Sequence, residues 1–549
     1  MTNLERSLAP TNLDSESDSP TTLCDDSSSW KSSDFRLDGK RRTKPRWTAL
    51  GLAGSAVYMS FGVLSLLPRS PIVPPYPVDI ERLSPYSLIA RFFHGSPSVL
   101  VVAFVILLTS AFALFALALR EAKKQPQRAL LPAAWAVGFA ILLVPTPPIA
   151  SQDIYSYAAY GRMAAFYYEN PYLSGPSKVA QDSTANFVGR MWWDMPSVYG
   201  PVMQGIAWAC ARVLGGLGIL IIGLKAVAAF FFALSLWLLI RCAQKLSRAA
   251  TVAVVAVGWN PLVLIHIVGG GHNDILVAAA LLGGLLLFLE GHRLLAGVVV
   301  TLGSLVKVTA LVPLFLYMLL VWRKREDIGG WQRVAWLVSL SSATVVAAYA
   351  PFWKGLDTLR ALVRVSGLQT SISAPYVSAQ VVHLGLESLG VRLFGVSGWV
   401  AIFRVALGVV FGLYVLLLCR RLGRSEELLP EVWGKALLAF CFTTAYLLPW
   451  YLVWPMLVLA LVSEGQTFRL AMAAAFVYSF TQLPGGYVLL SPNIRAIGEG
   501  LGKLAFFVVV VGFGIWLWLS RAGAVYDLGP RIGLAARADS ILSREVGSD

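Results

Sequence analysis

Apolar runs about twenty residues long recur between residues 47 and 520, and they constrain the fold of this chain more than any other feature. A helix needs roughly 20 apolar residues to cross the hydrocarbon core of a bilayer. Only 14% of the residues are charged, whereas soluble domains carry about 25%. The sequence therefore predicts an all-α, polytopic membrane protein. Because such runs recur along the chain, a signal peptide followed by a soluble domain is excluded. The polar leader of about forty residues before the first run also argues against cleavage.

Short clusters of Lys and Arg separate the apolar runs and predict the topology. Cytoplasmic loops carry such an excess of basic residues, so each cluster is assigned to the cytoplasmic side. This arrangement accounts for the net charge of +15 and argues against nucleic acid as a partner. We expect a multi-pass plasma membrane protein with both termini in the cytoplasm. The clusters lie at residues 120–128, 241–248, 292–293, 323–325, 420–424, 469 and 521.

The same assignment predicts about 13–14 transmembrane helices. Residues 1–46, rich in Ser and Asp, are expected to form a disordered cytoplasmic leader. Residues 47–520 are expected to form one transmembrane domain, and residues 521–549 a cytoplasmic tail. The stretch 201–214 is interpreted as a helix at the membrane interface. Candidate helices lie at 47–67, 99–120, 129–148, 217–241, 249–268, 275–291, 293–305, 308–322, 333–351, 396–419, 432–449, 451–463, 470–487 and 500–520.

The remaining segments, on the outer side, contain most of the candidate chemistry. Asp153 directly follows a predicted transmembrane helix and opens the long segment 149–200. A carboxylate there can accept a proton from an incoming hydroxyl as a general base. Tyr155 and Tyr157 offer flat faces for stacking on a sugar. The alternative, equally compatible with the spacing, is that Asp153 caps a short helix.

A glycine-rich turn at 269–274, with the sequence GGGHND, joins two apolar helices on the same side. Its glycines allow a sharp turn and a close approach to a ligand. His272 and Asp274 are candidates for holding a phosphate or, together with Asp153, a divalent cation. Two ligands in sequence leave metal binding undecided. The alternative is a capped turn with Asp274 at a helix N-terminus.

Two further outer turns add a cation and aromatic rings. Lys307 interrupts an apolar stretch, and a lysine at membrane depth is costly unless it faces protein or water. It can neutralise a phosphate as a point charge, or alternatively extend to the interface. Trp450 and Tyr451 belong either to a sugar- or lipid-binding surface or to an interfacial aromatic belt. Arg495 is another outer cation that could meet a phosphate.

The sequence contains no Walker loop, no dinucleotide fingerprint, no zinc pattern and no nucleophile elbow, which argues against nucleotide chemistry. The five cysteines lack metal-ligand spacing and form no disulfide framework.

Four motifs together resemble one known family. The sequence SQDIYSYAAYGR at 151–162, followed by Asn170-Pro171-Tyr172, is similar to the first-loop motif of bacterial α-1,6-mannosyltransferases that depend on polyprenol-phosphate-mannose. GGHND at 270–274, the lysine in LVKV at 305–308 and PWY at 449–451 match further motifs in the same order. These enzymes have the GT-C fold of membrane glycosyltransferases, and the resemblance covers roughly residues 47–520.

The resemblance implies a role for each candidate residue. Asp153 would be the base that activates the acceptor hydroxyl, and inversion of a β-linked donor would give an α-linkage. Donor phosphate binding would fall to Lys307, His272, Asn273 and Arg495. The acceptor or sugar would contact Tyr155, Tyr157, Arg162, Tyr199, Trp450 and Tyr451.

The implied partners are a polyprenyl-phosphate-sugar donor, a glycan or glycolipid acceptor and the bilayer. No cofactor is implied with certainty, and a divalent cation stays a candidate. The alternatives are a related transferase that uses polyprenyl-phosphate glucose or arabinose, and a secondary transporter or flippase. Transporters concentrate polar residues near the bilayer midplane, whereas the charges here gather at outer turns.

Overall fold

The computed structural model describes residues 46–326, 329–422, 425–462 and 465–481. Over these residues the protein is helical, and the described part contains no strand beyond a single bridge between Lys354 and Leu356. The predicted all-α membrane fold is confirmed. The predicted leader up to residue 45, Arg495, the helix at 500–520 and the tail at 521–549 lie outside the described residues.

Five described helices are long and apolar enough to cross a membrane. In the spans formed by α13 and α16, only 11% and 17% of the residues are buried inside the protein. Because their exposed side chains are largely apolar, these surfaces suit contact with lipid. The five helices are α1 (Trp47–Leu66), α4 (Pro97–Lys124), α8 (Leu217–Lys245), α13 (Gly330–Tyr349) and α16 (Val396–Leu422).

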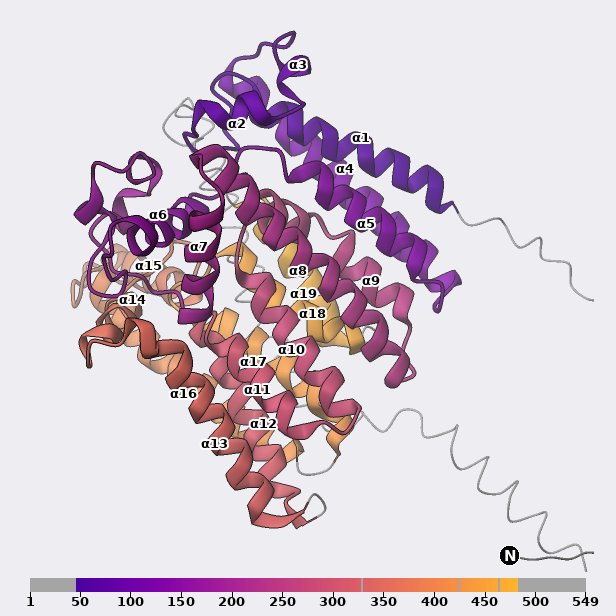
Figure 1. Ribbon diagram of the computed structural model, residues 1–549, viewed down its shortest axis with the longest axis vertical. Helices are drawn as coiled ribbons and strands as arrows, with labels where there is room; N and C mark the ends of the chain where they lie inside the picture. Colours follow the sequence, from indigo (N-terminus) through magenta and orange to yellow (C-terminus); the bar gives the residue numbers. More distant parts are fainter. Residues whose placement is uncertain (1–45, 327–328, 423–424, 463–464, 482–549) are drawn as a thin grey trace, which may run out of the picture. The chain divides into compact units, whose positions relative to one another are not determined.

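The N-terminal helices pack through aromatic side chains. Helices α1, α4 and α5 (Leu130–Leu143) lie side by side (Figure 1). Tyr58 of α1 contacts Phe139 of α5 at a centroid distance of 5.1 Å, and Phe61 meets Phe104 of α4 edge-on. This packing fixes the end of α5, from which the chain runs towards Asp153.

A sixth span is broken in the middle. The sequence predicts one helix over 249–268, but the structure bends it by 61° between α9 (Ala250–Gly258) and the π-helix η4 (Val263–Gly269). Pro261 lies at the break, where it has no N–H to donate, and the side chain of Asn260 accepts a hydrogen bond from the Leu262 N–H at 3.0 Å. The bent segment leads directly into the glycine-rich turn.

Shorter helices complete the body, and their bounds agree with the predicted segments to within a few residues at most ends. They are α10 (Asp274–Leu289), α11 (Arg293–Ser304), η5 (Val308–Ala310), α12 (Leu311–Arg323), α17 (Leu429–Thr443), η10 (Pro449–Leu452), α18 (Val453–Leu459), η11 (Ala460–Val462) and α19 (Gln466–Ser479).

The segments predicted to be outer loops contain helices of their own. The segment after Pro148 forms α6 (Asp153–Phe166), which packs against α7 (Pro201–Val213), the predicted interfacial helix. The others are α2 (Val78–Leu83), α3 (Ser87–Ala90), η1 (Pro176–Val179), η2 (Ala185–Phe187), η3 (Arg190–Trp192), η7 (Ala350–Phe352), η8 (Asp357–Leu359), α14 (Arg360–Ser366) and α15 (Ala374–Ser388).

Candidate active site

Asp153 is the first residue of α6, and the chain before it is held by main-chain contacts. The Ile149 N–H donates to the Gly269 carbonyl at 2.9 Å, and the Ala150 N–H donates to the Ile72 carbonyl at 2.8 Å. Ala150 has a φ of 64°, in the left-handed region, which costs energy for a residue with a side chain. The hydrogen bonds therefore stabilise the sharp turn of the chain before α6 and connect this turn to the glycine-rich turn.

The glycine-rich turn requires glycine at Gly271. Its φ is +72°, and a Cβ there would clash with the side chain of Ile154 on α6. The absence of a side chain thus lets the turn approach the start of α6 closely. As a result, His272 reaches the neighbourhood of Asp153 although the two residues lie far apart in sequence.

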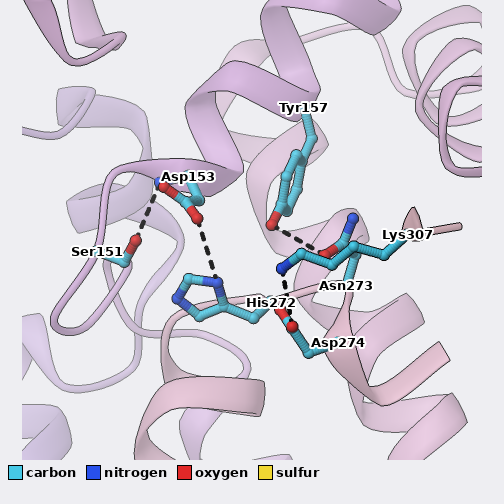
Figure 2. A network of polar contacts seen from close by, with 7 residues as sticks. All are labelled: Ser151, Asp153, Tyr157, His272, Asn273, Asp274 and Lys307. Carbon is cyan, nitrogen blue, oxygen red and sulfur yellow. Dashed lines mark hydrogen bonds and ion pairs between the residues drawn. The ribbon is translucent and has the colours of Figure 1, made fainter. Parts of the chain in front are cut away.

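The Asp153 carboxylate faces a neutral imidazole. Its Oδ2 lies 3.6 Å from Nδ1 of His272 (Figure 2), which is beyond hydrogen-bond length. Burial holds the pKa of His272 well below its usual range, so the ring carries no charge to pair with the carboxylate. Burial also raises the pKa of Asp153 to about 6, against an opposing effect of Lys307. Asp153 therefore has the proton affinity of a base that works near neutral pH.

Lys307 pairs with Asp274 rather than with the other turn residues. Its Nζ donates to Oδ1 of Asp274 at 2.9 Å, and Asp274 is fully buried (Figure 2). The ammonium also lies 4.3 Å from the ring centroid of Tyr451 and 5.1 Å from that of Trp454. These contacts stabilise a cation in a site with little water.

The loop containing Tyr199 is joined to the residues that precede Lys307. The Gly200 N–H donates to the Val306 carbonyl at 2.9 Å, and the Val202 N–H donates to the Leu305 carbonyl at 3.1 Å. A Cβ on Gly200 would clash with the Leu305 carbonyl, so only glycine permits this approach. The outer segment 149–200 is therefore connected to both turns that carry candidate residues.

Asp153 and Lys307 line the same cavity, which has a volume of about 380 Å³. Tyr199 and Tyr451, two of the predicted sugar-binding residues, line it as well. A carboxylate and an ammonium on the wall of one cavity can act on the two ends of a reacting bond. The remaining wall is largely apolar and comes mainly from α14, α16, α17 and the segment before η10, with further residues from η3 and η5.

The other predicted site residues lie around this cavity rather than on its wall. His272 stacks on Trp450 with a centroid distance of 3.8 Å, and the Tyr157 hydroxyl donates to Oδ1 of Asn273 at 3.4 Å. Tyr155 is buried against Phe187.

The structure does not bring Arg162 into this group. Its Nε lies 2.9 Å from a carboxylate oxygen of Asp182, and it is absent from the cavity wall. Its predicted role in sugar binding stays a prediction.

The candidates for metal binding do not form a compact ligand set. Within the described ranges, no three His, Cys, Asp or Glu side chains come close enough to hold a metal ion. Asp274 already bonds to Lys307, and His272 has two ring nitrogens without hydrogen-bond partners in the described part of the chain. Both nitrogens are buried behind the cavity wall, and we assign no role to a metal.

Two basic residues at the site escaped the sequence analysis. Arg404 of α16 lines the cavity. Lys225 of α8 is fully buried and donates to the carbonyl and hydroxyl of Thr146, at 2.6 and 2.7 Å, at the end of α5. Both interrupt apolar runs, which is the signal that singled out Lys307. Lys225 supports the chain leading to Asp153, whereas Arg404 faces the cavity.

Comparison with known proteins gives a consistent match over the half of the chain that contains Asp153 and Lys307. A family model described as alpha-(1->6)-mannopyranosyltransferase, N-terminal domain, matches residues 48–323. Alpha-(1->6)-mannopyranosyltransferase A of Mycobacterium tuberculosis is 28% identical over 341 residues, which cover 60% of this chain and 64% of that protein. Alpha-(1->6)-mannopyranosyltransferase B of Corynebacterium glutamicum is 26% identical over 423 residues, 70% of this chain and 67% of that protein. The chain thus spans about two thirds of the length of these relatives.

Proposed function

This chain belongs to the family of alpha-(1->6)-mannopyranosyltransferases, and from this membership we propose that it is a mannosyltransferase that uses polyprenyl-phosphate-mannose as donor. The acceptor is a glycan or glycolipid on the outer face of the plasma membrane, and the product is an α-1,6-linked mannose. The observation that carries the proposal is that Asp153 and Lys307 line the same cavity.

The reaction needs a base for the acceptor and a cation for the leaving group. The Asp153 carboxylate takes the proton of the acceptor hydroxyl while that oxygen attacks C1 of mannose. The bond between C1 and the phosphate oxygen breaks, and its electron pair leaves with the polyprenyl phosphate. Lys307 stabilises the charge that develops on this phosphate. Attack opposite the phosphate turns a β-linked donor into an α-linked product without a covalent enzyme intermediate.

The neighbouring residues support these two groups. The imidazole beside Asp153 is uncharged, and the rings of Tyr451 and Trp454 lie against the Lys307 ammonium. Tyr199, on the cavity wall, offers a face on which a sugar can stack.

A donor panel tests the proposal directly. Membranes containing the protein are incubated with a glycan acceptor and with polyprenyl-phosphate mannose, glucose or arabinose, and transferred sugar is measured. We expect transfer of mannose. Transfer of glucose or arabinose alone, or of no sugar, contradicts the proposed donor.

Asp153→Asn tests the mechanism because it keeps the size of the side chain and removes the base. We expect mannose transfer to fall by roughly 10²–10⁴-fold, the usual contribution of a general base. Asp194→Asn is the matched control, since Asp194 is an exposed carboxylate of the same outer segment and does not line the cavity. Equal activity of the two variants would remove Asp153 from the role of base.

A further inference from the structure

Arg404 is an unusual residue for its position in the chain. It lies in α16, and it is the first charged residue of this helix, followed by the uncharged residues 405–419 before Arg420. A charged side chain within a membrane-spanning helix is rare and faces the protein interior or a polar cavity. Arg404 lines the same cavity as Asp153 and Lys307, so its charge is available to whatever binds there.

The guanidinium group of Arg404 is oriented but not neutralised. Its Nη1 donates to the Ser366 carbonyl at 2.8 Å, and its Nη2 donates to the carbonyls of Gly367 and Leu368, each at 3.2 Å. No carboxylate pairs with it among the described residues. Arginine has five N–H donors, and its Nε is buried without a hydrogen-bond partner in this part of the chain. The side chain therefore has donors left for an anion.

An apolar wall continues from Arg404 along the same face of α16. Gly408 and Phe411 follow at spacings of four and three residues, which place them on one face of a helix, and both line the cavity. A Cβ on Gly408 would meet nothing within 4 Å, so the wall is open at this point. Leu362 and Val365 of α14 and Phe440 of α17 complete it.

The length of α16 fits a lipid whose phosphate lies at Arg404. At 1.5 Å per residue, Arg404 and Arg420 are about 24 Å apart along the helix. The hydrocarbon core is about 30 Å thick, so these two arginines suit opposite interfaces. Phe411 then lies about 10 Å deeper in the membrane than Arg404.

We propose that Arg404 binds the phosphate of the lipid-linked donor and that the α16 wall at Gly408 and Phe411 receives the first isoprenoid units. The inference rests on the proposed function, and it adds a second cation to the site. Lys307 is paired with Asp274, whereas Arg404 has no acidic partner in the described ranges. A guanidinium group can bind two phosphate oxygens at once.

The isoprenoid wall is tested with a matched pair of glycine variants. Gly408→Leu fills the open part of the cavity, whereas Gly412→Leu adds the same side chain to the same helix at a position that is equally open but does not line the cavity. Transfer from donors with a long prenyl chain and with a two-isoprene chain is measured. We expect Gly408→Leu to lower kcat/KM for the long-chain donor by about tenfold or more, with a smaller effect on the short-chain donor. Equal behaviour of the two variants would overturn the proposed wall.

The role of Arg404 is tested by binding of polyprenyl phosphate, without transfer. Detergent-solubilised protein is titrated with long-chain polyprenyl phosphate and, separately, with inorganic phosphate. We expect Arg404→Gln to weaken polyprenyl phosphate binding by about 10–100-fold, as for loss of a charged hydrogen-bond donor, and Arg404→Lys to restore part of it. Unchanged binding by a folded Arg404→Gln protein, or binding of inorganic phosphate as tight as that of the lipid, would overturn the proposal.

The two experiments separate this inference from the proposed function. One outcome is that polyprenyl phosphate binds in a way that depends on Arg404 although the unsubstituted protein transfers no mannose. That result would reject the proposed reaction and support the lipid site. Mannose transfer that neither Arg404→Gln nor Gly408→Leu changes would support the proposed reaction and reject the lipid site.

Discussion

At the scale of residues, Asp153 combines a partly buried carboxylate with an uncharged neighbour. Burial raises the pKa of Asp153 from its ordinary value near 3.8 to about 6, and burial keeps His272 neutral. The carboxylate is thus more basic than an exposed one but still largely ionised at pH 7. Such perturbed groups are typical of catalytic positions.

This arrangement predicts the pH dependence of transfer. A base works only in its ionised form, so kcat/KM is expected to rise with pH through about 6 and to level off above it. Burial holds the pKa of His272 well below its usual range, so we assign the expected profile to Asp153. Initial rates at low donor concentration, measured between pH 4.5 and 8, check the profile. A rate that falls as the pH rises through 6 would indicate that the protonated carboxyl is the active form.

Some residues of the candidate site could be predicted from the sequence and others could not. Asp153, Lys307 and His272 were identifiable because each stands at the edge of an apolar run or inside one. Arg404 carries the same signal, but nothing in its neighbourhood points to Asp153, which lies about 250 residues earlier. Only the packing of α14 and α16 around the cavity reveals that these residues share one space.

At the scale of elements, the glycine-rich turn determines where the start of α6 lies. Gly271 has a positive φ, and a Cβ there would clash with Ile154. Gly291, at the other end of α10, also has a positive φ, of 87°, but its Cβ would meet nothing within 4 Å. A residue with a side chain would be strained at both positions, but only at Gly271 would its Cβ also clash with a neighbouring helix.

We therefore expect different consequences for alanine at these two positions. Gly291→Ala should lower stability by about 1 kcal/mol through strain alone and leave transfer unchanged. Gly271→Ala should cost about 1–3 kcal/mol more through overpacking and should also lower transfer, since it displaces the residue next to Asp153. Thermal unfolding in detergent and the transfer assay measure both effects. Equal loss of activity in the two variants would refute a special role for the contact with α6.

The elements themselves were largely predictable, and the exceptions have physical causes. Apolar runs determine where helices can span, so helices such as α1 and α8 begin and end close to their predicted bounds. The bend between α9 and η4 was missed because hydrophobicity continues across it. Its local cause is Pro261, which disfavours helical geometry at Asn260. A short helix at Asp153 was one of the two alternatives, and the interfacial helix at 201–214 was predicted. The other short helices of the outer segments, such as α2 and α15, were missed because their sequences lack a clear period.

At the scale of the whole molecule, the proposed mechanism depends on the side of the membrane on which the cavity opens. The basic clusters predict that residues 352–395 lie outside and residues 323–325 inside. Leu356, in the first segment, is 79% exposed, and the side chain of Glu326, beside the second, is 87% exposed.

Cysteine labelling of intact cells tests this topology. We expect Leu356→Cys to react with a membrane-impermeant maleimide and Glu326→Cys to react only after permeabilisation, because cytoplasmic loops carry the basic residues. The unsubstituted chain measures the background from its own cysteines. Labelling of Glu326→Cys alone in intact cells would invert the topology and place the proposed acceptor on the wrong side.

The backbone hydrogen bonds that connect the outer segment to the two turns have an evolutionary consequence. The contacts from Ile149 to Gly269 and from Gly200 to Val306 are made by main-chain atoms, so they survive most changes of the side chains at Ile149 and Val306. Selection on these links acts mainly on Gly200, where any side chain would clash. Side chains around such a site can therefore change widely while the main chain still holds Asp153 and Lys307 at the same cavity.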